Sequence, residues 1–197
     1  ALLASRVTGI QEFRDLFSSE VLAPGLELGI ENLTFLFTDL KDSTPMYEEM
    51  GDASAFALVR DHFDILTNSI KLNNGAVVKT IGDAVMAVFQ TNREAQLSAI
   101  QILVDMKTKF PNASVKIGIH SGSCIAVTSN EKLDYFGSTV NKAARIQGLS
   151  IGSDIVMNQE IDNPDLFSPN QFQKEIFQSK LKGISGDVSL IRYIYKI

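Results

Sequence analysis

Cysteine is almost absent from this sequence, which has one, Cys124, among 197 residues. A single thiol excludes an intramolecular disulfide and favours a protein that works in a reducing compartment, the cytoplasm. Apolar runs long enough to cross a bilayer are also missing, and no signal peptide is visible at the N-terminus. The chain begins at Ala1 rather than Met, which is typical of a piece of a longer protein whose other part would hold a regulatory domain.

An excess of positive charge is missing as well. The formal net charge is −5, with 18 basic against 23 acidic residues, so the chain has no general attraction to nucleic acid or to anionic membranes. A polyphosphate ligand would therefore need metal ions to offset the repulsion. Internal repeats, low-complexity tracts and a Pro/Gly/Ser-rich linker are absent too. Hydrophobic residues make up 45% of the chain, which suits one globular domain with a proper core.

The order of the predicted elements indicates an α+β fold. We interpret residues 1–32 as an N-terminal linker segment and residues 33–197 as the main domain. Strands that alternate with helices around one antiparallel hairpin predict a ferredoxin-like βαββαβ core, with helices packed on a mixed sheet. The expected strands are 33–37, the hairpin 75–89, 115–120, 124–128, 153–157, 172–177 and 188–194, and the expected helices are 11–17, 45–50, 53–71, 91–109 and 138–148.

Two amphipathic segments are expected to pack by their apolar faces. Helical spacing predicts that one face of the 53–71 helix turns to the core. The apolar residues of the linker segment are expected to pack on the domain or on a second copy. The members of the helix face are Phe56, Val59, Phe63, Leu66 and Ile70, and those of the linker are Phe13, Leu16, Phe17, Val21 and Leu22.

The hairpin over 75–89 carries two charges in an otherwise apolar sequence. Two strongly apolar strands meet at a tight Gly82-Asp83 turn, and we expect this hairpin to be central in the sheet and buried on both faces. Lys79 and Asp83 interrupt the apolar run. Because buried charges are costly unless they meet a partner, a metal or a ligand, the hairpin is a candidate functional site.

Asp39, at the end of the first predicted strand, is the natural partner of Asp83. If their strands are neighbours, both carboxylates point at one place and form a hard-oxygen site for Mg²⁺ or Mn²⁺. The alternative is that Asp39 caps the next helix and Asp83 is an ordinary turn residue. Thr44 followed by Pro45 predicts the start of that helix, with Thr44 as its N-cap, and the free N–H groups there form an anion site.

Two further pairs combine charge with hydrogen-bonding groups. Asn141 and Arg145 are four residues apart, which places them on one helix face. Arg145 can bind a phosphate and Asn141 can orient a hydroxyl, although a solvated helix face explains the same spacing. Lys79 and Asp134 provide a donor and an acceptor that could read a purine edge, and a plain salt bridge is the alternative. His62, His120 and Cys124 are interpreted as structural.

Three motifs, in this order, resemble the catalytic domain of class III adenylate and guanylate cyclases. They are FTDLKDST (37–44), KTIGD (79–83) and DYFGSTVNKAAR (134–145). The resemblance covers roughly residues 33–195, and it extends to bacterial cyclases in which this domain ends a longer chain.

The resemblance implies a role for each matched residue. Asp39 and Asp83 would bind two Mg²⁺ or Mn²⁺ ions, Lys79 and Asp134 would select adenine, Asn141 would orient the ribose, and Arg145 would stabilise the transferring phosphoryl group. The triphosphate would be held by the main-chain amides of Leu40, Lys41, Asp42, Ser43 and Thr44, with Lys182 as an additional phosphate contact in a loosely matching tail.

The resemblance also implies an activity and an assembly. The chain would be an adenylate cyclase, in which the ribose 3′-hydroxyl of ATP attacks the α-phosphate to give cyclic AMP and pyrophosphate. It would act as a head-to-tail homodimer, with the aspartates of one subunit facing Lys79, Asp134, Asn141 and Arg145 of the other. Guanylate cyclases of this family usually carry Glu and a small residue such as Cys at the Lys79 and Asp134 positions. Guanylate cyclase and a non-catalytic nucleotide-binding or dimerisation module remain the alternatives.

Overall fold

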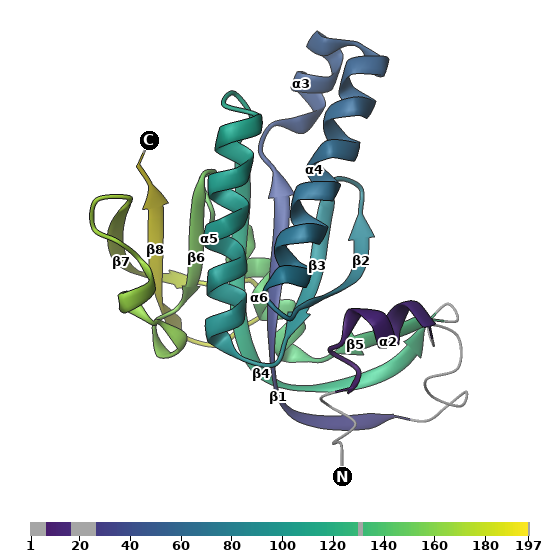
Figure 1. Ribbon diagram of the computed structural model, residues 1–197. Helices are drawn as coiled ribbons and strands as arrows, with labels where there is room; N and C mark the ends of the chain where they lie inside the picture. The colour runs from purple at the N-terminus through teal and green to yellow at the C-terminus, as the bar shows by residue number, and fades with distance from the viewer. Residues whose placement is uncertain (1–6, 17–26, 130–131, 197) are drawn as a thin grey trace.

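The computed structural model describes residues 7–16, 27–129 and 132–196, and in it a single mixed sheet carries all the strands (Figure 1). The sheet has eight strands in the order β2-β3-β1-β4-β6-β8-β7, and β5 pairs with β4 outside this path. The strands are β1 (Leu28–Leu40), β2 (Ala76–Ile81), β3 (Ala84–Phe89), β4 (Val115–Ser129), β5 (Lys132–Phe136), β6 (Asp154–Asn158), β7 (Phe172–Lys180) and β8 (Asp187–Tyr195). The helices are α2 (Gln11–Leu16), α3 (Ser43–Met50), α4 (Asp52–Leu72), α5 (Asn92–Lys109) and α6 (Ser138–Gln147), with short 3₁₀ turns η1 (Gln159–Ile161) and η2 (Pro164–Leu166).

The first four strands have the ferredoxin-like order that the sequence predicted. β1 pairs antiparallel with β3 and with β4, and β2 pairs antiparallel with β3. β4 and β6 run parallel, which makes the sheet mixed. The prediction of an α+β fold with helices packed on a mixed sheet is therefore confirmed.

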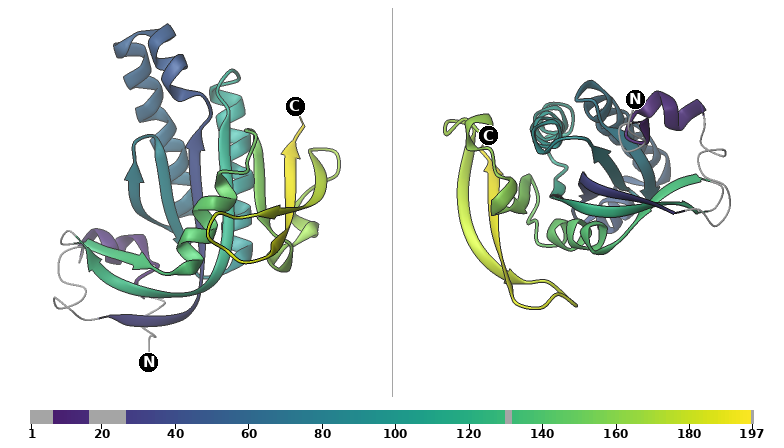
Figure 2. Two further views of the ribbon diagram at one scale, coloured as in Figure 1. Left: turned by 180° about the vertical axis from the view of Figure 1, so that it is seen from behind. Right: turned by 90° about the horizontal axis from the view of Figure 1, so that it is seen from below.

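Helices cover both faces of the sheet, with α4 and α5 on one face and α6 on the other (Figure 2, right). Alternate residues of β1 enter different cores, as the strand period of two requires. Leu36 packs in the core beneath α4 and α5, whereas Phe35 packs in the core that contains Ala143 of α6. Gly118 lets α6 approach β4 closely, because a Cβ there would lie 2.2 Å from the backbone nitrogen of Gln147.

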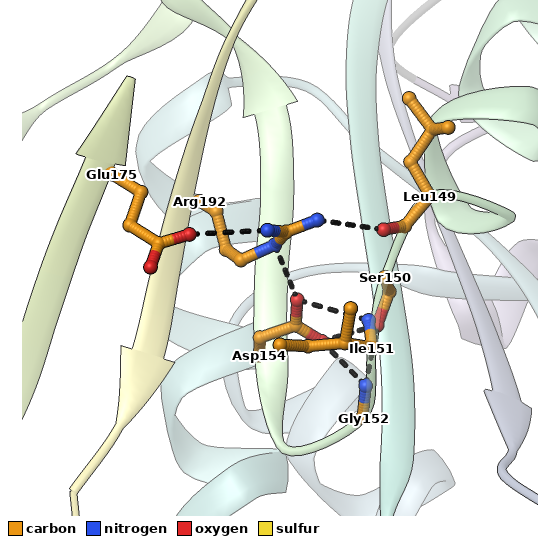
Figure 3. Close-up of polar contacts among 7 residues, drawn as sticks. All are labelled: Leu149, Ser150, Ile151, Gly152, Asp154, Glu175 and Arg192. Atoms are coloured by element: carbon orange, nitrogen blue, oxygen red, sulfur yellow. Dashed lines mark hydrogen bonds and ion pairs between the residues drawn. The ribbon is translucent and has the colours of Figure 1, made fainter. Parts of the chain in front are cut away.

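A polar network fastens the loop after α6 to the C-terminal strands (Figure 3). Asp154, which is fully buried, accepts hydrogen bonds from the hydroxyl of Ser150 and from the Gly152 amide, the latter at 2.9 Å. Arg192 Nε lies 3.0 Å from Asp154 Oδ2, and its Nη2 donates to the Leu149 carbonyl oxygen at 2.9 Å. The loop that ends α6 is thereby tied to β6 and β8.

The hairpin differs from the sequence prediction in one strand. β3 is buried along most of its length, but β2 is the edge strand, and the residues from Lys79 to Ile81 are exposed. The expectation of burial on both faces is therefore wrong for β2. The reason is that an apolar strand sequence does not say whether a second neighbour will cover it.

Several local expectations also need correction. The predicted strands 115–120 and 124–128 form the single strand β4. Phe56 is 72% exposed, because α3 and the first turns of α4 project beyond the sheet (Figure 1), whereas Leu66 and Ile70 are buried as predicted. α3 begins at Ser43 with Asp42 as its N-cap, so Thr44 lies inside the first turn and is not the cap. β1 begins at Leu28, five residues before the predicted strand.

The linker segment contains α2, and only part of its predicted apolar packing lies within this chain, where Phe13 is half-buried. Leu16 is 76% exposed, while the polar Arg14 is buried. Phe17, Val21 and Leu22 lie outside the described residues, and the domain division at residue 32 stays a prediction. Over the part of the chain that the structure describes, no helix is long and apolar enough to cross a membrane.

Candidate active site

The structure brings Asp39 and Asp83 to the same end of the sheet. β1 and β3 are neighbours, with Thr38 opposite Val85, so the end of β1 lies beside the β2–β3 turn. Burial raises the pKa of Asp39 above its ordinary value, the negative charge of Asp83 raises it further, and Lys116 and Gln147 oppose both effects. The two carboxylates are therefore close enough to repel each other.

Two side chains support Asp83 from the helical side of the sheet. His62 is fully buried in α4, and its Nε2 lies 3.2 Å from the main-chain oxygen of Asp83. Because a carbonyl oxygen only accepts, Nε2 carries the proton, and burial lowers the pKa of His62 so that the ring stays neutral. Tyr47 of α3 places its hydroxyl 3.5 Å from Asp83 Oδ2. The sequence assigned His62 no such contact, and nothing in its helical spacing marks it.

The donor set at Asp39 and Asp83 fits a divalent hard cation. Carboxylate oxygens are preferred ligands of Mg²⁺ and Mn²⁺, and a bound cation would remove the repulsion between the two groups. Among the described residues there is no cluster of three or more His, Cys, Asp and Glu side chains that could hold a metal. The remaining ligands would then have to be phosphate oxygens, main-chain carbonyls or water.

Lys79 and Asp134 meet in an ion pair. Lys79 Nζ lies 2.5 Å from Asp134 Oδ2, and the two side chains are 43% and 19% exposed. The Tyr135 amide donates to Asp134 Oδ1 at 2.8 Å, which orients the carboxylate. The partners come from β2 and β5, so the charge of Lys79 is satisfied at an open edge rather than in the core.

Asn141 and Arg145 lie on α6, and Arg145 is joined there by the β7–β8 turn. The Arg145 guanidinium lies 3.6 Å from the position that a Cβ on Gly183 would occupy. Lys182 precedes Gly183 and is exposed, as is Asn141. The structure therefore brings the turn that contains Lys182 near Arg145, in a region where the sequence motif was weakest.

The loop between β1 and α3 has fewer free amides than the sequence suggested. The Lys41 amide donates to the Ser114 carbonyl oxygen at 2.8 Å, so it is committed to the neighbouring strand. The first N–H groups of a helix have no intrahelical partner, which leaves the amides at the start of α3, those of Asp42, Ser43 and Thr44, without an intrahelical acceptor. Asp42 precedes them with φ 52° in the left-handed region, which Asp tolerates better than most residues.

His120 and Cys124 occupy structural positions, as the sequence predicted. Both are buried in β4. Burial, together with the charge of Lys142, lowers the pKa of His120 to about 4. Burial raises the pKa of Cys124 to about 11, so at neutral pH the imidazole is uncharged and the thiol is protonated.

Comparison with known proteins gives a consistent result. Residues 28–186 match the model of the adenylate and guanylate cyclase catalytic domain. A curated adenylate cyclase from Anabaena cylindrica is 29% identical over 89% of this chain and 40% of its own length. An adenylate cyclase from Lachancea kluyveri is 28% identical over 84% of this chain and 10% of its own length. The chain thus spans a minor part of these relatives.

Solved structures share the fold at lower sequence identity. The catalytic core of a rhodopsin-guanylyl cyclase with converted specificity, in complex with ATPalphaS, has a TM-score of 0.75 at 21% identity and covers 87% of this chain and 100% of its own. The adenylyl cyclase CyaB from P. aeruginosa has a TM-score of 0.71 at 18% identity and covers 87% of this chain and 97% of its own. These neighbours include cyclases named for adenine nucleotides and cyclases named for guanine nucleotides. The shared fold therefore does not show which purine this chain would bind.

Proposed function

The chain belongs to the family of adenylate and guanylate cyclase catalytic domains, and from this premise we propose that it is an adenylate cyclase. Its substrate would be ATP and its products 3′,5′-cyclic AMP and pyrophosphate. The observation that carries the choice of base is the pair of Lys79 and Asp134, a donor and an acceptor 2.5 Å apart at an accessible edge. Asp134 can accept from the exocyclic amino group of adenine, and Lys79 can donate to a ring nitrogen.

The reaction is an intramolecular phosphoryl transfer. The ribose 3′-oxygen forms a bond to the α-phosphorus, the bond from that phosphorus to the bridging oxygen breaks, and the hydroxyl proton passes to solvent. Two Mg²⁺ or Mn²⁺ ions held by Asp39 and Asp83 would supply Lewis-acid activation of the hydroxyl and charge neutralisation of the leaving phosphate oxygens. The protein itself contributes positioning and electrostatic stabilisation.

The other polar residues would act on the ribose and the phosphates. Asn141 orients the ribose, and Arg145 stabilises the charge that develops on the transferring phosphoryl group with its planar cationic fork. Lys182, in the turn beside Arg145, would add a second cation. The amides at the start of α3, those of Ser43 and Thr44, would bind phosphate oxygens, as free N–H groups at a helix start do.

The position of Arg145 supports active sites that are shared between two subunits. Its guanidinium lies beside Gly183 in the β7–β8 turn, whereas Asp39 lies at the end of β1 and Asp83 in the β2–β3 turn. In the sheet, β4 and β6 separate β1 from β8 and β7. A head-to-tail homodimer would place Asp39 and Asp83 of one subunit opposite Asn141 and Arg145 of the other.

Two features of the whole protein also belong to the proposal. A regulatory domain in another part of the parent chain would control the cyclase, since the chain spans only part of its curated relatives. The cytoplasm would be the compartment, because it supplies ATP and keeps the lone thiol of Cys124 reduced.

A product assay separates this proposal from its alternatives. Purified protein, at a concentration that favours dimers, is incubated with Mn²⁺ and either ATP or GTP, and the nucleotide products are resolved by chromatography. We expect cyclic AMP from ATP at a higher kcat/KM than cyclic GMP from GTP. A preference for GTP would identify a guanylate cyclase and refute the roles of Lys79 and Asp134, and no cyclic product from either would point to a non-catalytic module.

A further inference from the structure

The two strands that carry Lys79 and Asp134 are not joined to each other by the sheet. β2 pairs with β3 at one edge, and β5 pairs with the outer part of β4. Between them lies an open cavity of about 310 Å³, lined on the strand side by Val77, Val78, Lys132 and Leu133 and on the other side by residues of α2. Ladder hydrogen bonds therefore do not set the separation of the two strands, and α2 lies across the gap (Figure 1).

α2 holds the β2 side of this gap through Gln11. The Val77 amide donates to Gln11 Oε1 at 2.7 Å. This amide belongs to the edge strand, so no neighbouring strand competes for it. Val77 precedes Lys79 by two residues, with a register shift of the β2–β3 ladder between them, so a change in this contact would reach Lys79 through a short stretch of backbone.

α2 holds the β5 side through Arg14. Arg14 Nη2 donates to the Leu133 carbonyl oxygen at 2.6 Å, and its Nη1 lies 3.5 Å from the Tyr135 hydroxyl. The guanidinium also lies 5.6 Å from the centre of the Tyr135 ring. Leu133 and Tyr135 are the two residues that flank Asp134, the predicted acceptor of the base. Arg14 therefore contacts β5 on both sides of Asp134.

The burial of Arg14 indicates that these contacts are specific. Its exposed fraction is 7%, and within the described ranges no carboxylate lies at ion-pair distance from it. A buried cation without an ion-pair partner is costly unless hydrogen bonds satisfy it. Two carbonyl oxygens supply that compensation, Leu133 O of β5 at 2.6 Å from Nη2 and Thr8 O at 3.3 Å from Nη1. The contact with Leu133 ties α2 to β5.

We propose that Gln11 and Arg14 are positioning residues that set the separation of Lys79 and Asp134, and with it the preference of the site for adenine over guanine. This inference rests on the proposed function, because it concerns the base-binding part of the same site. Hydrogen bonds weaken over a few tenths of an ångström. A small shift of β2 against β5 would therefore misalign one of the two contacts to the base without touching Asp39, Asp83 or Arg145.

The test compares four variants on α2. Gln11→Met removes the acceptor but keeps the length of the side chain. Gln11→Glu restores an acceptor and is made together with Asp15→Asn, because Gln11 Nε2 donates to Asp15 Oδ1 at 2.7 Å and two carboxylates there would repel. Arg14→Met removes the hydrogen bonds from the guanidinium to β5. Glu12→Gln is the matched control, because Glu12 is exposed on the same helix. Each variant is measured for equilibrium binding of ATP and of GTP, and for kcat and KM with both nucleotides.

We expect the ATP-to-GTP ratio of affinities to fall about tenfold in Gln11→Met and Arg14→Met, the loss that one misaligned hydrogen bond gives. The fall should appear mainly in KM for ATP, with kcat and the Mn²⁺ dependence kept. Glu12→Gln should behave as wild type, and Gln11→Glu with Asp15→Asn should recover the preference. The proposal would be overturned by an unchanged ratio in Gln11→Met, with faster hydrogen exchange of the Val77 amide showing that this contact is lost, together with an unchanged ratio in a folded Arg14→Met. Because binding needs no turnover, a wild-type protein that forms no cyclic product would contradict the proposed function and leave this test intact.

Discussion

Replacing Asp154 by Asn should destabilise the protein far more than replacing an exposed carboxylate. Asp154 is fully buried, and its partner Arg192 has a side chain that is 15% exposed. Asparagine keeps one acceptor oxygen for the amides of the loop, but it removes the negative charge beside the guanidinium. Arg192 would then retain Glu175, at 3.1 Å, as its remaining ionic partner.

The magnitude follows from the degree of burial. Removing one partner of a buried ion pair costs about 3–5 kcal/mol, whereas an exposed pair contributes about 0–1 kcal/mol. The Glu175 contact and the retained oxygen offset part of the loss, so we expect a decrease of about 3 kcal/mol in the free energy of unfolding. Activity should fall as well, because the loop that Asp154 fastens ends α6, the helix that carries Asn141 and Arg145.

Urea denaturation at a fixed protein concentration measures the change. The matched control is Asp61→Asn, which removes a partly exposed carboxylate that lies 3.0 Å from Lys109 and 3.1 Å from Arg60. This variant should unfold much nearer to the wild-type midpoint, because such exposed pairs contribute little. Combining Asp154→Asn with Arg192→Met should cost less than the sum of the two single changes. If Asp154→Asn unfolds at the same urea concentration as Asp61→Asn, the network of Figure 3 does not fasten α6.

Two further predictions concern the buried histidines. The pKa of His120 is about 4 in the folded protein, against an ordinary value of 6.5. As the pH falls from 6.5 towards 4, the unfolded chain therefore binds a proton at His120 before the folded chain does, and the free energy of unfolding decreases. His120→Gln should reduce the slope of the free energy of unfolding against pH between pH 6.5 and 4, by at most about 1.4 kcal/mol per pH unit. The same slope in the variant and the wild type, measured by urea titrations, would contradict this. His62→Phe removes the donor to the Asp83 main chain and should raise the Mn²⁺ concentration for half-maximal activity about tenfold, as loss of a supporting contact to a metal ligand does, and an unchanged Mn²⁺ titration would show that the contact does not position Asp83.

Two parts of the site were predictable, for different reasons. Asn141 and Arg145 share a helix face because they are only four residues apart. Asp39 and Asp83 are distant in sequence, and their pairing followed from the ferredoxin-like order of elements, which places an antiparallel hairpin beside the first strand. The observed register, with Thr38 opposite Val85, agrees with that expectation.

The parts that failed depend on distant contacts. The sequence of β2 predicts a buried strand, because its apolar residues resemble those of β3. Only the order of strands in the sheet shows that β2 lies at the edge. Phe56 fits the helical period of α4, but periodicity does not tell where the sheet beneath the helix ends. Arg14 contacts a carbonyl 119 residues away in sequence, and no local pattern marks a polar side chain for such a role.

Mixing two inactive variants is the most direct test of an ATP-converting site that two subunits share. Asp39→Ala removes a metal ligand, and Arg145→Ala removes the phosphoryl contact, so each variant alone should form no cyclic AMP. In an equal mixture that exchanges subunits, half of the dimers are mixed and each has one intact site, so we expect about a quarter of the wild-type rate from ATP. No cyclic AMP from a mixture whose mixed dimers are demonstrated by mass spectrometry would contradict the account.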